Sequence, residues 1–269
     1  MKLHVHTANF AYLRALSRRC CSIQGDRVRV AVIGSDVPAL VLALKLVKDH
    51  TVTVVEQEAE IGMPVHHPGR VFDLDLLSQY IPPSHHTILQ LQQNDVDYGC
   101  RWEWVIKLLT IECSTHGVNF ETRSRITSMV NGDFGTRLNF NNSQTKDWLE
   151  VDAVVDMNIV QDLGPGKRTH SLNHENLVPW GRPEMAAAQG VLVPTAHLEE
   201  LSPPDPAFVV GRADAQTEIW WYGTAEWEPA KGVLERMTGR LPLNPRLVSF
   251  DGCVLLAERV HKGMEVTHI

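Results

Sequence analysis

The stretch Val28–Glu56 has the clearest hydrophobic pattern in the chain, with two short apolar runs on either side of a longer one. The run Val28–Ile33 is long enough for a buried parallel strand, and the β-branched run Thr51–Val55 is typical of a second strand. Between them, Val37–Val47 is apolar almost all round, as expected of a helix buried against a sheet. Pro38 is tolerated in the first turn of such a helix. The pattern therefore predicts a βαβ unit.

The turn after the first apolar run resembles the dinucleotide-binding motif G-x-G-x-x-G/A. Gly34 and Ala39 match its first glycine and its final small residue, but Asp36 replaces the middle glycine. A carboxylate there adds bulk and repels a phosphate by about 4 kcal/mol at roughly 4 Å and an effective dielectric near 20. Glu56 ends the second strand about 20 residues beyond the turn, where an acid would meet a ribose hydroxyl. The motif therefore predicts the βαβ fold, but the Asp36 substitution predicts that a dinucleotide binds poorly.

Further elements follow along the chain. Trp102–Thr115 is predicted to be a helix that Gly117 caps. Strands are predicted at Val118–Glu121, Ile126–Val130, Arg137–Phe140 and Leu149–Met157, then at Gly190–Pro194, Ala207–Val210 and Glu218–Tyr222. The region Leu163–Ala188 has little periodicity. Near the end, we expect Lys231–Thr238 to be helical and Leu247–Leu256 to be a final strand.

Composition and charge exclude several classes of protein. The 269 residues are 43% hydrophobic and 21% charged, which is ordinary globular composition. The net charge of −7 and the lack of a basic stripe argue against a nucleic-acid binder, and no apolar run is long enough to span a membrane. The 5 cysteines, without C-x-x-C spacing, favour a reducing compartment over a disulfide framework.

The N-terminal segment differs from the rest of the chain. Residues 1–25 contain no Asp or Glu but several basic and apolar side chains. This pattern is typical of an organellar transit peptide, and a basic tail is the other interpretation. It predicts a mitochondrial location, with the cytoplasm as the alternative.

Three segments together resemble one known family: Val28–Glu56, Glu58–Arg70 and Trp102–Met157. Their order is similar to that of the FAD-dependent oxidoreductases with a glutathione-reductase-type Rossmann fold, especially the aromatic-hydroxylase and geranylgeranyl-reductase branch. The resemblance implies an α/β fold, with a Rossmann-type FAD/NAD(P)-binding domain that has a parallel sheet and a β-meander, and a smaller, mostly antiparallel second domain. It also implies a set of cofactor-binding residues: Gly34, Ser35, Ala39, Glu56 and Arg70.

The same resemblance suggests four regions in the chain. These are a basic arm or targeting segment at 1–27, the Rossmann-type domain at 28–162, a smaller substrate-domain-like region at 163–246, and a terminal strand at 247–269 that returns to the Rossmann-type domain.

The chain departs from the family pattern where the cofactor would lie. Asp36 is the first departure. In the family, the strand similar to Ala153–Met157 is usually followed by an Asp-Gly pair near the flavin, whereas this chain has Asp156-Met157-Asn158. A late strand of the family ends in Gly-Asp, and Ala257-Glu258 stands in its place. The end at Ile269 also comes too early for the full terminal helix of the family. We therefore expect no cofactor or weakly bound FAD, with NAD(P) a poorer candidate.

Other residues with possible chemistry give weaker signals. The adjacent pairs His66-His67 and His85-His86 are poor chelates, so no metal site is predicted. Residues Gly164–Arg168 form a basic loop without phosphate-loop spacing. The aromatic cluster Trp220–Trp227 is compatible with a substrate cavity, a core or a protein interface. No motif assigns a catalytic residue.

Three functions remain open from the sequence. The leading hypothesis is a vestigial flavoprotein-fold protein, a non-catalytic structural or interaction subunit bound to other protein subunits. The alternative is an active FAD-dependent oxidoreductase, a monooxygenase or reductase, that acts on an apolar or aromatic substrate. A third is an NAD(P)-binding regulatory module.

Overall fold

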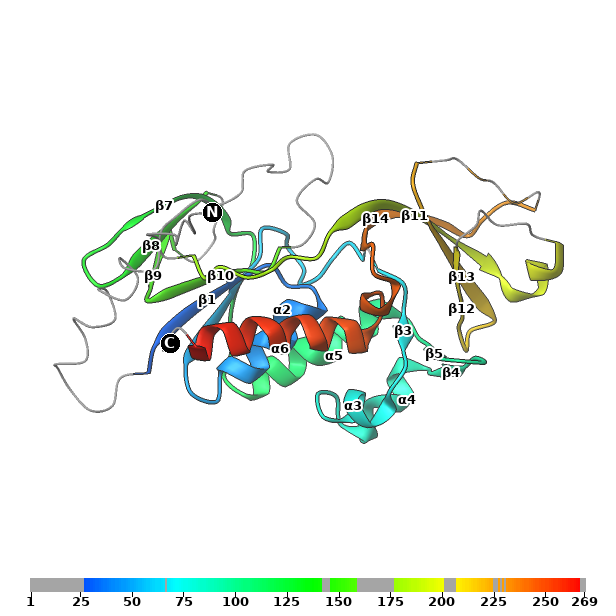
Figure 1. Ribbon diagram of the computed structural model, residues 1–269, viewed down its shortest axis with the longest axis horizontal. Helices are drawn as coiled ribbons and strands as arrows, with labels where there is room; N and C mark the ends of the chain where they lie inside the picture. The colour runs from blue at the N-terminus through cyan, green and yellow to red at the C-terminus, as the bar shows by residue number, and fades with distance from the viewer. Residues whose placement is uncertain are drawn as a thin grey trace, which may run out of the picture.

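The computed structural model describes residues 27–65, 67–141, 146–158, 177–200, 207–224, 227, 229 and 231–266. Nearly all of the predicted N-terminal arm, the loop 164–168 and His66 therefore lie outside the described residues. Figure 1 shows a central parallel sheet with helices on one face, a meander beside it and a second sheet at the far end.

The central sheet is parallel, with the strand order β10-β1-β2-β6. Its strands are β1 (Arg29–Ile33), β2 (Thr51–Val55), β6 (Asn119–Glu121) and β10 (Ala153–Asp156). Strands β1 and β2 pair in parallel from Arg29 opposite Thr51 onward, and α2 (Val37–Leu46) connects them. The predicted βαβ unit and the α/β fold class are thus confirmed.

The two faces of the central sheet bury alternate side chains, as the two-residue period of a strand requires. Val30 and Val32 of β1 pack with the helices, whereas Ala31 and Ile33 pack with the meander. The helix layer contains α2, α5 (Trp102–Thr115) and α6 (Phe250–Val266). The meander contains β7 (Arg125–Asn131), β8 (Thr136–Asn141) and β9 (Trp148–Val151).

The second sheet is antiparallel, with the order β12-β13-β11-β14. Its strands are β11 (Met185–Pro194), β12 (Ala207–Gly211), β13 (Gln216–Tyr222) and β14 (Glu235–Pro242). Consecutive residues of β13 point to opposite faces, so Trp220 packs with Val248 while Trp221 stacks edge-on against Trp227 at 5.6 Å. The aromatic cluster of the sequence is therefore divided between two cores.

Short elements join the two sheets. A small sheet contains β3 (Arg70–Val71), β4 (Gln92–Gln93) and β5 (Tyr98–Gly99), in the order β3-β5-β4. The short helices are α3 (Leu74–Ser78), α4 (His86–Leu89), η1 (Pro83–His85), η2 (Thr195–Glu200) and η3 (Pro245–Leu247).

Two predictions of secondary structure were wrong. The second half of the predicted helix Lys231–Thr238 lies in strand β14, because pairing with β11 overrides local propensity, and the first half is in neither a helix nor a strand. The predicted terminal strand Leu247–Leu256 belongs to η3 and α6. A smaller difference is that Leu149–Met157 forms two strands, β9 and β10, rather than one.

Helix α6 accounts for two features near the end of the chain that differ from the family pattern. Ala257-Glu258 lies inside this helix, so it does not replace a Gly-Asp pair at a strand end. The chain also has room for a terminal helix, since α6 contains 17 residues and packs along α2. The departures at Asp36 and Met157-Asn158 remain.

Candidate functional site

The candidate site lies at the carboxyl edge of the parallel sheet, where β1, β2 and β10 end side by side. Ligands of open α/β sheets bind at this edge. The turn after β1 needs a glycine, since Gly34 has a φ of +96° and a Cβ there would lie 3.2 Å from the Asn158 nitrogen. At this edge the Ser35 hydroxyl contacts Glu56, the Gly34 amide donates to the Val55 carbonyl, and Ala39 lies in the first turn of α2. That these residues bind a cofactor stays a prediction.

Glu56 at the end of β2 is bound by the chain itself. Ser35 Oγ donates a hydrogen bond to Glu56 Oε2 at 2.5 Å, and the Glu58 amide donates to Oε1 at 3.0 Å. The Ser35 oxygen in turn accepts from the Gly62 amide at 2.7 Å. Burial raises the pKa of Glu56, and the Ser35 bond partly offsets this rise. The Ser35 hydroxyl thus contacts Glu56, the carboxylate that the motif expects to bind the ribose hydroxyl of a cofactor.

Asp36 is the N-cap of α2. Its Oδ1 accepts from the Val37 amide at 2.7 Å, and the Trp102 indole nitrogen lies 3.5 Å from the same oxygen. A helix N-terminus carries partial positive charge and binds anions, including the pyrophosphate of dinucleotides. Here the anion at that position is a side chain. The residues at the α2 N-terminus therefore do not fit a cofactor pyrophosphate.

An aromatic pair lies beside Asp36 at the α2 N-terminus. Trp102, the first residue of α5, is 1% exposed, and its ring stacks on that of His67 at 4.4 Å between centroids. Burial lowers the pKa of His67, although the Asp36 carboxylate acts in the opposite direction. Nδ1 of His67 donates to the Pro68 carbonyl at 2.8 Å, since a carbonyl oxygen can only accept. Sequence reasoning did not single out Trp102, because its only local signal is that it begins a helix.

A third carboxylate, Asp156, ends β10. Arg182 forms an ion pair with Asp156 Oδ2, and the Asn158 amide donates to Oδ1 at 3.1 Å. The Trp180 indole donates to the Asp156 carbonyl at 2.9 Å. Asp156, which precedes Met157-Asn158, is thus held by Trp180 and Arg182 from the segment that leads to the second sheet.

Arg70, the fifth predicted cofactor residue, lies in the small sheet. Its Nε donates to Asp97 at 2.8 Å, and its guanidinium lies over the rings of Phe72 and Phe208 at 4.9 and 5.3 Å. This ion pair and these rings occupy the guanidinium, and a contact of Arg70 with a cofactor stays a prediction.

Within the described residues, no cluster of three or more His, Cys, Asp or Glu side chains could hold a metal ion. Among the described helices, none is both long and apolar enough to cross a membrane.

Comparison with known proteins shows similarity in structure but not in sequence. No protein family matches the sequence, and no curated protein is significantly similar to it. A glycerol-3-phosphate dehydrogenase from Bacillus halodurans complexed with FAD superposes with a TM-score of 0.57 at 10% identity, over 94% of this chain and 67% of that one. A geranylgeranyl bacteriochlorophyll reductase-like protein from Thermoplasma acidophilum gives 0.53 at 11% identity, over 90% and 77%. The halogenase PltM gives 0.53 at 10% identity, over 89% and 69%.

The chain has the FAD/NAD(P)-binding Rossmann-type fold. Identities of 10–11% establish the fold alone. The chain spans 55% of the length of the Diels-Alderase PyrE3, another similar structure with a TM-score of 0.50 at 12% identity, over 80% of this chain. The activities of these proteins therefore come to this chain only as proposals.

Proposed function

We propose that this protein is a flavoprotein-fold scaffold without a redox reaction of its own, which works as a structural or interaction subunit of a larger assembly. The observation that carries the proposal is the Asp36 carboxylate at the N-terminus of α2. A bound pyrophosphate would meet a fixed negative charge where the motif has a glycine.

The surroundings of Asp36 support this proposal. Three carboxylates, Asp36, Glu56 and Asp156, border one edge of the sheet, and each is engaged by groups of the protein. The stacked rings of Trp102 and His67 pack beside Asp36, and the Trp102 indole nitrogen lies 3.5 Å from its carboxylate. FAD would therefore bind weakly or not at all, and NAD(P) is a poorer candidate because the chain resembles FAD proteins.

A partner is supported by apolar side chains on the meander. Val130, Phe134 and Trp148 are 43%, 70% and 47% exposed, although most large apolar side chains of the described residues are buried. All three come from the same meander, and large apolar patches on a protein surface are typical of interaction sites. A mitochondrial location of the assembly rests only on the acid-free N-terminal segment.

The alternative function is an FAD-dependent oxidoreductase that acts on an apolar or aromatic substrate. Two observations favour it: the fold is shared with a dehydrogenase complexed with FAD, and Gly34 and Glu56 occupy their motif positions at the sheet edge. In this case a cofactor would have to displace the Asp36 carboxylate from the helix N-terminus.

Native mass spectrometry of the protein purified from its natural source separates the two functions. The proposal predicts a complex with other chains that carries no flavin mass. A flavin-loaded monomer that turns over a substrate would contradict the proposal and establish the oxidoreductase.

A further inference from the structure

The second sheet meets the small sheet and the loop 67–70 at one tightly fitted junction. A Cβ on Gly99 of β5 would lie 1.9 Å from the carbonyl oxygen of Gly211 in β12, so the two strands touch backbone to backbone. Asn94 Nδ2 also lies 3.5 Å from the Gly211 carbonyl oxygen. Only glycine at position 99 permits this approach.

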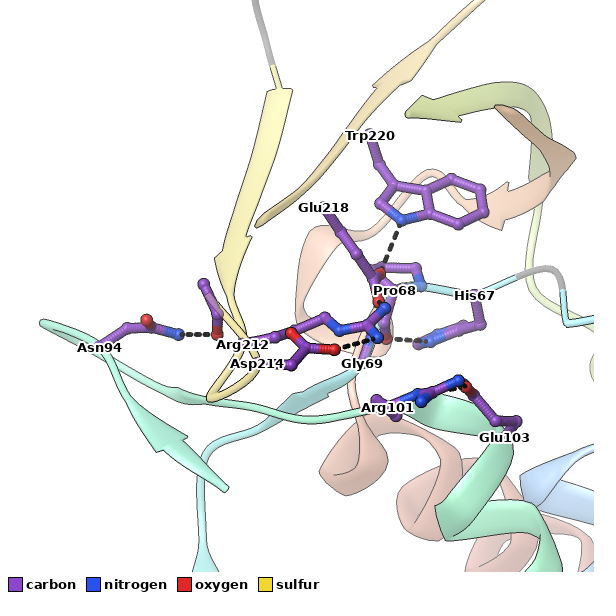
Figure 2. A network of polar contacts seen from close by, with 11 residues as sticks. His67, Pro68, Gly69, Asn94, Arg101, Glu103, Arg212, Asp214, Glu218 and Trp220 are labelled. Atoms are coloured by element: carbon purple, nitrogen blue, oxygen red, sulfur yellow. Dashed lines mark hydrogen bonds and ion pairs between the residues drawn. The ribbon is translucent and has the colours of Figure 1, made fainter. Parts of the chain in front are cut away.

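A buried ion network lies at the same junction (Figure 2). Glu218 Oε1 of β13 is 3.2 Å from Arg212 Nη1, and Arg212 Nη2 is 2.8 Å from Asp214. The other oxygen of Glu218 accepts from the Trp220 indole at 3.0 Å and from the Gly69 amide at 3.3 Å. The Gly69 bond crosses from the second sheet to the loop that also carries His67.

The network is closed to solvent but is not fully satisfied. The side chains of Arg212 and Glu218 are 8% and 5% exposed. Yet Arg212 Nε and Asp214 Oδ1 are buried without a hydrogen-bond partner among the described residues. Each buried polar atom of this kind is costly, and water would satisfy it if the junction opened. Buried ion pairs of this type add little net stability, because desolvation offsets their attraction, but removing one partner alone is strongly destabilising.

We propose that the Arg212–Glu218 pair and the Gly99–Gly211 contact form a clasp that holds the second sheet against the loop 67–70. The clasp has a closed state, which is the structure described, and an open state in which water enters the junction. Opening separates Phe208 of the second sheet from Arg70, whose guanidinium lies 5.3 Å from the Phe208 ring in the closed state. Gly99, Gly211, Arg212 and Glu218 lie outside the Asp36 site, although the loop that they hold also carries His67, and the test below needs no cofactor.

Hydrogen–deuterium exchange of the full chain tests the clasp. Glu218→Gln keeps the side-chain shape but leaves the buried Arg212 charge to Asp214 alone. We expect exchange at Gly69 and in β12–β13 to become at least about tenfold faster while β1 and β2 stay protected, because a buried charge has lost its partner. The control, Glu235→Gln, removes an exposed carboxylate from β14 in the same sheet and should leave exchange unchanged.

A second variant tests the clasp without altering any charge. Gly99→Ala places a Cβ against the Gly211 carbonyl and should speed exchange in the same segments, whereas Gly263→Ala adds a Cβ to open space on α6. Native exchange at Gly69 and β12–β13 in both Glu218→Gln and Gly99→Ala would overturn the proposal. A rise of equal size in β1 and β2 in both variants would also overturn it, since the junction would then unfold with the core.

Discussion

Replacing Asp36 separates the two ways in which this residue opposes a dinucleotide. Asp36→Asn removes the charge but keeps the cap of α2, because asparagine is as good an N-cap as aspartate. Asp36→Gly removes both the charge and the bulk and restores the G-x-G spacing that begins at Gly34. Glycine at an N-cap costs only a few tenths of a kcal/mol, so both variants should fold.

The size of the effect follows from Coulomb's law. Asp36 Oδ1 is 2.7 Å from the Val37 amide, which a bound phosphate would also need to approach. Two like charges about 4 Å apart repel by about 4 kcal/mol at an effective dielectric of 20, or about a thousandfold in Kd. Asp36 is partly exposed, so solvent screens much of this repulsion. We expect Asp36→Asn to bind FAD about tenfold tighter than the native chain, and Asp36→Gly to bind it tighter still.

Isothermal titration of the native protein and both variants with FAD checks this order. Thermal unfolding without ligand confirms that the variants are folded. If the native protein binds FAD as tightly as Asp36→Gly, the carboxylate does not obstruct the site and the reasoning fails. If Asp36→Asn gains nothing while Asp36→Gly gains fully, bulk rather than charge is the obstacle.

Three further predictions concern the same structure. Burial raises the pKa of Glu56 in the folded chain above its usual value near 4.5, so folding favours the protonated carboxyl. The contribution of Glu56 to stability is therefore present at low pH and is lost as the pH rises through the folded pKa. Glu56→Gln should therefore raise the melting temperature relative to native more at pH 7 than at pH 4, and an equal shift at both would contradict this. Trp102→Ala should lower the free energy of unfolding by about 3–5 kcal/mol in urea titrations, and Trp102→Phe by less, because a 1% exposed ring leaves a cavity. Gly190→Ala puts a Cβ 2.6 Å from the Trp220 ring and should cost about 1–3 kcal/mol in urea, whereas Gly181→Ala, in open space, should cost under about 0.5; equal costs would refute the packing argument.

Much of the fold can be predicted from periodicity alone. The strand Thr51–Val55 and the helix Trp102–Thr115 have the predicted bounds because their apolar patterns match one period over their whole length. The error at α6 shows the limit of a short window. Phe250, Cys253, Ala257 and Met264 are buried at helical spacing. This period becomes clear only when the window extends past Leu256, the end of the predicted strand.

The candidate site is less accessible to sequence reasoning. Gly34, Ser35 and Glu56 meet as the motif predicts, because two parallel strands bring their ends together. The sequence identifies Asp36 as an obstacle but not as the cap of α2. The Arg212–Glu218 pair reaches Gly69 across 149 positions, and no local pattern encodes such a contact.

The visible absorbance spectrum of the native protein, purified from its natural source, shows whether the fold still binds a flavin. The account predicts a colourless protein that lacks the bands of an oxidised flavin, because Asp36 occupies the anion position at the N-terminus of α2. A yellow protein with flavin bands at near-stoichiometric occupancy would contradict it.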